Sequence, residues 1–284
     1  MTEAKSVLSI HSHVARGHVG NSAAVLPLQR LGHEVWAVPS VVLAHHLGRG
    51  GWRGRRLGAD AVAEVLAGIE ADGGFAELAA VHTGYLGDIG VGEAALAAWA
   101  RIAAARPDAL ICCDPILGDE DEGLYVEAAL VDFYRDRALP AAHVIFPNRF
   151  ELATLSGEAV EAPASAVRAA RRLIAQGPKI VVATSVPAGD GLASLLVTAD
   201  AAWQAVVPRR PLAAKGAGDV FAALWLGHYL NGGDAAAALG RAAGAADALI
   251  REAVRTGAPE LPLVGAQAQW TDPAAWIDVL PLNL

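Results

Sequence analysis

The stretch that decides the fold runs from Val7 to Val38 and reads VLSIHSHVARGHVGNSAAVLPLQRLGHEVWAV. It opens with a short apolar run, Val7–Ile10, and closes with another, Glu34–Val38, and both are typical of buried strands. Between them, Gly20–Leu31 carries apolar residues at helical spacing. A strand, a helix and a second strand in this order predict a parallel sheet with a helix packed on it.

The same alternation of short apolar runs and longer alanine-rich stretches continues along the chain. The further runs predicted as buried strands are Leu78–His82, Ala109–Cys113, His143–Phe146 and Ile180–Ala183. The stretches predicted as helices are Asp60–Ile69, Val91–Ala105, Tyr125–Ala138 and Ala164–Gln176. This order predicts an α/β protein of three layers, with helices on both faces of a mostly parallel central sheet.

The pattern changes after Thr184. Leu192–Thr198 and Ala201–Val207 are predicted as an antiparallel hairpin at an edge of the sheet. Two helices, Ala217–Leu230 and Asp234–Val254, are expected to follow. The sequence contains no evident linker, internal repeat or low-complexity tract, so we expect a single domain over residues 1–284.

Composition and charge exclude several classes of protein. Apolar residues make up 54% of the 284, which excludes disorder as the main state, and the net charge is −8. Without clustered Lys and Arg, we expect no nucleic-acid or membrane partner. The two cysteines, Cys112 and Cys113, are adjacent and cannot form a disulfide framework. The polar N-terminus is unlike a signal peptide, no run is long enough to span a bilayer, and we expect a cytoplasmic protein.

Polar or turn-forming segments follow the predicted strands, and ligands bind at the carboxyl ends of strands in open parallel sheets. These segments are His11-Ser12-His13, Pro39-Ser40, Thr83-Gly84-Tyr85, Asp114-Pro115, Pro147-Asn148 and Thr184-Ser185. We therefore expect the site at this edge of the sheet.

The segment KGAGDVF at residues 215–221 leads directly into an apolar helix. Its two glycines allow backbone N–H groups at a helix N-terminus to face an anion. Asp219, in the first turn, is placed to accept a proton from a substrate hydroxyl, which is the combination that phosphoryl transfer needs. The alternative is a tight turn in which Asp219 only caps the helix.

Three further polar residues are candidates for binding a cation near phosphates. Asn148 and Glu151 are three residues apart at a predicted helix start and share one face, where they could hold a hydrated Mg²⁺. Asp114 ends an apolar strand and could reach phosphates through a cation. The alternatives are a helix cap, a solvated acid and a turn residue, respectively.

Other nucleotide and metal motifs are absent from the sequence. It contains no G-x-x-x-x-G-K-[ST], and no G-x-G-x-x-G follows the first strand. The nine histidines show no spacing typical of a zinc site, so hydrogen-bonded histidines are expected instead. Cys112 and Cys113 end a predicted strand and are expected to be inert core thiols.

Six motifs occur in an order that resembles the pyridoxal kinases of the ribokinase-like superfamily over nearly the whole chain. They are SIHSHVARGHVGN (9–21), TGYLG (83–87), CDPILGD (113–119), PNRFELATLSG (147–157), TS (184–185) and GAGD (216–219). The resemblance implies a ribokinase-like fold and transfer of the γ-phosphate of ATP to the 5′-hydroxymethyl group of pyridoxal, with Mg²⁺, potassium stimulation and a homodimer. It also implies a mobile loop over the site, which would lie at the acidic stretch Asp119–Gly123; the alternative is that this stretch is a solvated run of charges.

The resemblance also implies roles for particular residues. Asp219 would be the catalytic base, beside an anion hole formed by the amides of Gly216, Ala217 and Gly218. Residues implied in substrate binding are Ser12, His46 and Tyr85. Those implied in nucleotide binding are Asp114, Asn148, Glu151, Thr184 and Ser185, and the metal would be held by Asp114, Asp119 and Glu151.

Three residues depart from the pattern of that family. Leu43 stands where an aromatic residue is usual, and Leu47 replaces a threonine near the substrate. Lys215, one of three lysines, precedes the anion hole and could neutralise phosphate charge or simply be exposed. Two alternatives therefore stay open: a kinase of the same fold for pyridoxine, hydroxymethylpyrimidine or a sugar, and a catalytically silent vitamer-binding protein.

Overall fold

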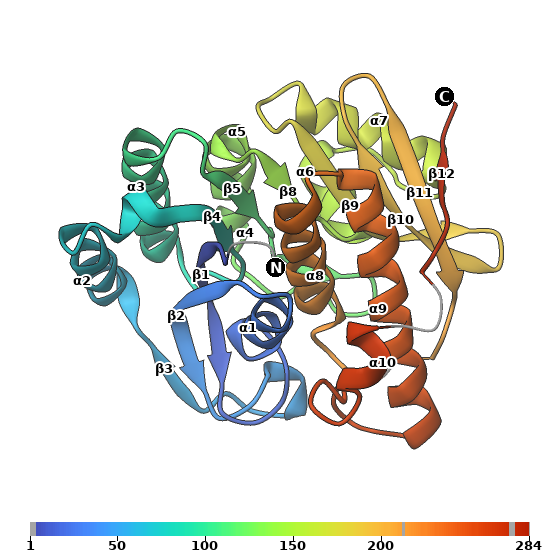
Figure 1. Ribbon diagram of the computed structural model, residues 1–284, viewed down its shortest axis with the longest axis horizontal. Coiled ribbons are helices and arrows are strands. Elements are labelled where there is room, and N and C mark those ends of the chain that lie inside the picture. The colour runs from blue at the N-terminus through green and yellow to red at the C-terminus, as the bar shows by residue number, and fades with distance from the viewer. Residues whose placement is uncertain (1–3, 212–213, 273–275, 284) are drawn as a thin grey trace.

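The central feature of the computed structural model is a ten-stranded sheet in the order β12-β11-β10-β9-β8-β5-β4-β1-β2-β3 (Figure 1). The structure describes residues 4–211, 214–272 and 276–283. The strands that pair in parallel are β1 (Ser6–Val14), β2 (Glu34–Leu43), β4 (Leu78–Thr83), β5 (Leu110–Cys113), β8 (Val144–Ile145) and β9 (Ile180–Ala188). The predicted parallel core of the sheet is confirmed.

Antiparallel strands extend the sheet at both ends. They are β3 (Gly54–Arg56), β10 (Gly191–Val197), β11 (Ala202–Pro208) and β12 (Val279–Pro281). The predicted hairpin is present as β10–β11, but its position at the edge was wrong, because β12 pairs with β11 beyond it. A separate two-stranded sheet is formed by β6 (Gly118–Asp119) and β7 (Gly123–Leu124).

Helices pack on both faces of the sheet, because buried strand residues point alternately to opposite sides. In β1, Val7 belongs to one hydrophobic core, and Leu8 and Ile10 belong to the other. The first core packs against α1 (Asn21–Arg30), α8 (Ala217–Gly232), α9 (Ala235–Thr256) and α10 (Gln267–Thr271). The second packs against α2 (Gly58–Ala71), α3 (Ile89–Ala105), α4 (Ala128–Phe133), α5 (Leu139–Ala141), α6 (Arg149–Ser156) and α7 (Pro163–Ile174).

One predicted helix differs from the structure. The stretch Tyr125–Ala138 was expected to be a single helix, but α4 begins only at Ala128, and Tyr134–Ala138 forms a π-helical turn. This turn places Tyr134 in the core, where its hydroxyl donates a hydrogen bond to the carbonyl of Gly84 at 3.1 Å. A buried phenol needs such a partner, and a local apolar period cannot specify it.

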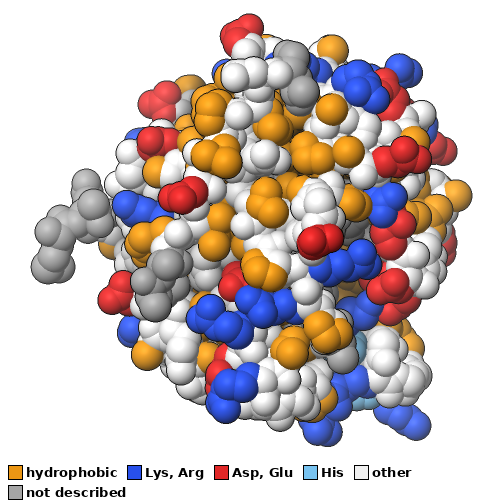
Figure 2. Space-filling model, turned by 90° about the vertical axis from the view of Figure 1, so that its right-hand side faces the viewer, with side chains coloured by type: hydrophobic (Ala, Val, Ile, Leu, Met, Phe, Trp, Pro, Cys, Tyr) orange, Lys and Arg blue, Asp and Glu red, His pale blue; other side chains and the backbone are white. Residues whose placement is uncertain are grey.

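The charges on the surface and the character of the helices are relevant to the expectation that the protein has no nucleic-acid or membrane partner. Figure 2 views the molecule from the side of β12, and its described part carries basic and acidic side chains interspersed with apolar ones. Within residues 4–211, 214–272 and 276–283, none of the helices combines the length and apolar character needed to cross a membrane.

Candidate active site

A cavity of about 340 Å³ lies at the carboxyl ends of the parallel strands, as predicted. The cavity is lined by all the residues for which a catalytic, binding or metal-ligating role was predicted: Ser12, His46, Tyr85, Asp114, Asp119, Asn148, Glu151, Thr184, Ser185, Lys215, Gly216, Ala217, Gly218 and Asp219. These residues come from segments that together span more than 200 positions of the chain, from Ser12 to Asp219. The structure therefore brings the whole predicted set together, while their individual roles remain predictions.

The glycine turn before α8 presents backbone donors to the cavity. Gly216 precedes the helix with φ of 92°, and a Cβ there would lie 1.9 Å from the carbonyl oxygen of His18, so only glycine fits. The first amides of an α-helix have no partner within the helix. The N–H groups of Ala217 and Gly218 are consequently available to an anion, which the dipole of α8 also favours.

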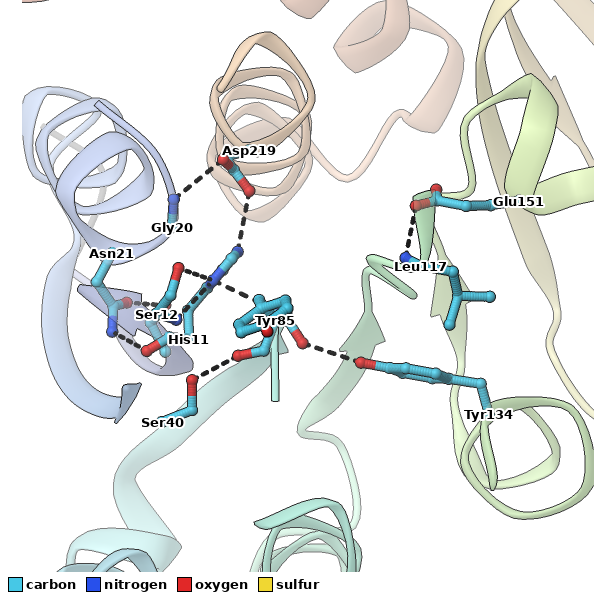
Figure 3. A network of polar contacts seen from close by, with 12 residues as sticks. His11, Ser12, Gly20, Asn21, Ser40, Tyr85, Leu117, Tyr134, Glu151 and Asp219 are labelled. Carbon is cyan, nitrogen blue, oxygen red and sulfur yellow. Dashed lines mark hydrogen bonds and ion pairs between the residues drawn. The ribbon is translucent and has the colours of Figure 1, made fainter. Parts of the chain in front are cut away.

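Asp219 lies in the first turn of α8, only 8% exposed, at the wall of the cavity (Figure 3). One carboxylate oxygen is 3.0 Å from Nε2 of His11, and the other accepts a hydrogen bond of 3.0 Å from the N–H of Gly20. Burial opposes ionisation, but the contacts with His11 and Gly20 outweigh it and hold the pKa of Asp219 below the usual range. Asp219 is thus an ionised carboxylate able to accept a proton.

The residues expected to bind the substrate, Ser12, His46 and Tyr85, all line the cavity. Burial raises the pKa of Tyr85, so its phenol stays protonated near neutral pH. Burial lowers the pKa of His46, whose Nε2 is 3.6 Å from a carboxylate oxygen of Glu260. Leu43 and Leu47, two of the three departures from the family pattern, also line the cavity, so it has two aliphatic side chains in place of an aromatic ring and a threonine hydroxyl.

Asn148 and Glu151 form a capping box at the start of α6. The side chain of Asn148 accepts from the N–H of Glu151 at 2.9 Å, and Glu151 Oε2 accepts from the N–H of Asn148 at 2.8 Å. Glu151 Oε1 also accepts from the N–H of Leu117 at 2.9 Å. The cap that the sequence left as an alternative is therefore present, and the same two side chains line the cavity.

Asp114 and Glu151 are two buried carboxyl groups that line the cavity. Burial raises the pKa of both, and the negative charge of Glu151 raises that of Asp114 further. A divalent cation would relieve this repulsion, and carboxylate oxygens are ligands that Mg²⁺ prefers. No three His, Cys, Asp or Glu residues of the described segments are close enough to bind a metal by themselves. A cation here would need water or phosphate oxygens to complete its ligands.

Asp119, the third predicted metal ligand, pairs with a lysine. Its carboxylate is 3.0 Å from Nζ of Lys215, and Glu122 is 2.7 Å from the same nitrogen. Burial would raise the pKa of Asp119, but Lys215 and two backbone N–H groups lower it. The acidic stretch, where the resemblance places a loop, forms the β6–β7 hairpin in this structure.

Thr184 and Ser185 lie in a β-bulge of β9. The pairing of β9 with β10 shifts between Ala193 and Leu195, which leaves these two residues opposite Ser194 alone. Ser185 has φ of 62°, in the left-handed region that non-glycine residues rarely adopt. Bulges redirect side chains beside active sites, and this one exposes Ser185 to the cavity.

The histidine and cysteine predictions had mixed outcomes. Cys112 and Cys113 are fully buried, and burial raises the pKa of both thiols, so the prediction of inert core thiols is confirmed. His11 is hydrogen-bonded as expected, but His82 is not: it is fully buried, and neither ring nitrogen has a partner among the described residues. The contact of His11 with Asp219 was missed. The only signal in the sequence was its place directly after the first apolar run.

The chain is similar to known kinases in sequence and in fold. Residues 55–264 match the family described as phosphomethylpyrimidine kinase. The chain is 45% identical over 273 residues to "Pyridoxal kinase PdxY" of Rubrobacter xylanophilus (94% of each chain) and 41% identical over 279 residues to that of Deinococcus radiodurans (95% and 94%). Pyridoxal kinase from Leishmania donovani in complex with ADP and pyridoxine has a TM-score of 0.93 and 32% identity, covering 99% of this chain and 100% of that one. By sequence and by its ribokinase-like fold, the chain belongs to the pyridoxal kinase family.

Proposed function

We propose that this protein is an ATP-dependent pyridoxal kinase that phosphorylates the 5′-hydroxymethyl group of pyridoxal in vitamin B6 salvage. The observation that carries the proposal is the placement of the ionised Asp219 beside the available amides of Ala217 and Gly218, in a cavity that also contains Ser12 and Tyr85. Membership of the pyridoxal kinase family supports the choice of substrate.

The residues of the cavity suggest how the reaction proceeds. Asp219 accepts the proton of the 5′-hydroxyl as its oxygen attacks the γ-phosphorus of ATP, and the O–P bond to ADP breaks. The N–H groups of Gly216, Ala217 and Gly218 stabilise the charge that develops on the transferred phosphoryl group. Ser12, His46 and Tyr85 would hold the pyridine ring.

The other side of the cavity would hold the nucleotide. Asp114, Asn148, Glu151, Thr184, Ser185 and Lys215 are the residues proposed to contact it. Asp114 and Glu151 suit Mg²⁺, which when bound would neutralise phosphate charge, and Asp119 would join them only if it leaves Lys215.

One observation favours a second acceptor. Leu43 and Leu47 present apolar side chains to the substrate end, so a pyridine or pyrimidine that lacks the aldehyde could bind as well as pyridoxal. The candidates are pyridoxine and hydroxymethylpyrimidine. The catalytically silent alternative is less well supported, because Asp219, Asn148 and Glu151 are all retained and all line the cavity.

The test is to measure kcat/KM for pyridoxal, pyridoxine, pyridoxamine, hydroxymethylpyrimidine and ribose with ATP, Mg²⁺ and K⁺, and to identify the product by mass. We expect pyridoxal to be preferred. A strong preference for another acceptor would identify the protein as a kinase of the same fold with that substrate. Binding of pyridoxal without turnover would identify a catalytically silent binding protein. Omitting K⁺, measuring the mass of the assembly and locating the protein in cells test potassium stimulation, the homodimer and the cytoplasmic location.

A further inference from the structure

His11 is the side chain that contacts the proposed catalytic base. It lies in β1, 208 residues before Asp219, and its ring is only 1% exposed. Its Nε2 is 3.0 Å from Oδ1 of Asp219. His11 also lines the cavity, and its ring lies between Asp219 and Tyr85 (Figure 3).

The other ring nitrogen, Nδ1, is already occupied by two backbone donors, and the hydroxyl of Ser12 lies 3.4 Å from it. Nδ1 accepts hydrogen bonds from the N–H of Ser12 at 2.8 Å and from the N–H of Tyr85 at 3.2 Å. A nitrogen that accepts from two N–H groups presents its lone pair and carries no proton. The ring proton is therefore on Nε2, from which it is donated to Asp219, and the tautomer is set by the hydrogen bond at the opposite nitrogen.

Two glycines build the slot that holds this ring. A Cβ at Gly84 would lie 2.0 Å from Nε2 of His11, and a Cβ at Gly20 would lie 2.9 Å from its Nδ1. Gly20 also donates its N–H to the second oxygen of Asp219. Each oxygen of the Asp219 carboxylate thus accepts one hydrogen bond, and its remaining lone pairs can accept the proton of the substrate hydroxyl.

We propose that His11 is a positioning residue that orients the Asp219 carboxylate by a hydrogen bond from Nε2, with its tautomer fixed by the backbone of Ser12 and Tyr85. The same ring therefore ties the base to two segments proposed to hold the substrate. The proposal rests on the proposed function for its kinetic consequences, whereas the tautomer does not depend on it.

Two variants test the role, His11→Leu and His11→Gln. Leucine removes the donor at similar size, whereas the amide of glutamine can place an N–H where Nε2 lies. We expect His11→Leu to lower kcat about 10- to 100-fold with the KM values for ATP and the acceptor changed less than about 3-fold, because a displaced base affects the chemical step. His11→Gln should restore kcat to within about 3-fold of the unaltered protein.

A double variant separates positioning from a structural role. If His11 acts through Asp219, then His11→Leu combined with Asp219→Asn should be no slower than Asp219→Asn alone. Multiplicative losses, full activity of His11→Leu, or failure of His11→Gln to restore kcat in folded protein would each overturn the proposal. Thermal unfolding and calorimetry with ADP identify a variant that is merely misfolded.

A measurement that needs no turnover distinguishes failure of this proposal from failure of the proposed function. The ¹⁵N shifts of the His11 imidazole in the unaltered protein should show a protonated Nε2 and an unprotonated Nδ1, and Gly84→Ala, which crowds the ring, should alter them. A proton on Nδ1 would overturn the proposal even if pyridoxal is phosphorylated. Absence of turnover with every acceptor, together with the expected shifts, would refute the kinase assignment and leave the pairing intact.

Discussion

The side-chain nitrogen of Lys215 lies 3.0 Å from a carboxylate oxygen of Asp119, a residue 96 positions earlier in the chain. This pair joins the residue before the glycine turn to the β6–β7 hairpin, and Glu122 completes it at 2.7 Å. All three line the cavity. The positive charge of Lys215, which could neutralise phosphate or simply be exposed, is therefore paired with two carboxylates of the protein.

Replacing Lys215 tests whether it contacts the phosphates of ATP or only pairs with Asp119 and Glu122. The three side chains are 38%, 31% and 47% exposed, so Lys215→Gln should change the free energy of unfolding by less than about 1 kcal/mol. If Lys215 turns to the phosphates, the KM for ATP should rise about 5-fold, which corresponds to about 1 kcal/mol. Steady-state kinetics measure this, with Lys179→Gln, at an exposed lysine outside the cavity, as the matched control. An unchanged KM would leave Lys215 with a structural role only.

Asp219→Asn tests the proposed base. The amide preserves the size of the side chain but accepts a proton poorly, so kcat should fall about 10²- to 10⁴-fold. Binding of ADP, measured by calorimetry, should stay within a few-fold of the unaltered protein. Turnover near the normal rate would show that another group accepts the proton.

The two glycines of the G-A-G-D segment should respond differently to alanine. Gly216→Ala adds a methyl group 1.9 Å from a backbone oxygen at positive φ, and should lower the free energy of unfolding by roughly 2 kcal/mol or more. Gly218 has open space around it within α8, so Gly218→Ala should leave that free energy unchanged or raise it by up to about 1 kcal/mol. Urea unfolding of both variants measures the difference. Equal losses would contradict the geometry of the turn.

Because His82 is buried, we expect the free energy of unfolding to depend on pH. Burial, reinforced by His11, lowers the pKa of His82 to about 3, from 6.5. Below pH 6.5 the unfolded chain takes up a proton that the folded protein refuses, so this group destabilises the fold by about 1.4 kcal/mol per pH unit as pH falls from 6.5 toward 3. Above pH 6.5, His82 is neutral in both the folded and the unfolded chain, so this loss of stability is absent.

His82→Leu removes this titration without changing the size of the side chain much. Urea unfolding at pH 7.5, 6.5, 5.5 and 4.5 should show the stability of the variant gaining on that of the unaltered protein as the pH falls. Parallel curves for the two proteins over this range would show that His82 does not titrate as inferred.

Much of the fold could be predicted from local pattern. Short apolar runs such as Val7–Ile10 and Leu78–His82 became β1 and β4, because residues buried on both faces of a sheet must be apolar throughout. Strands such as β3, with the sequence Gly-Arg-Arg and every side chain exposed, carry no such signal. β12, with the sequence Val-Leu-Pro, was missed because three residues are too few for an apolar run to stand out, and its pairing with β11 makes it a strand.

The sequence by itself determined where the site lies. Polar residues after successive parallel strands must meet at one edge of the sheet, and a glycine turn before an apolar helix must present free amides. Only the tertiary structure decided which side chains pair there. His11 meets Asp219 across 208 residues, and Lys215 meets Asp119 across 96. Such contacts depend on ångström-scale distances between elements, which the period of apolar residues along the chain does not specify.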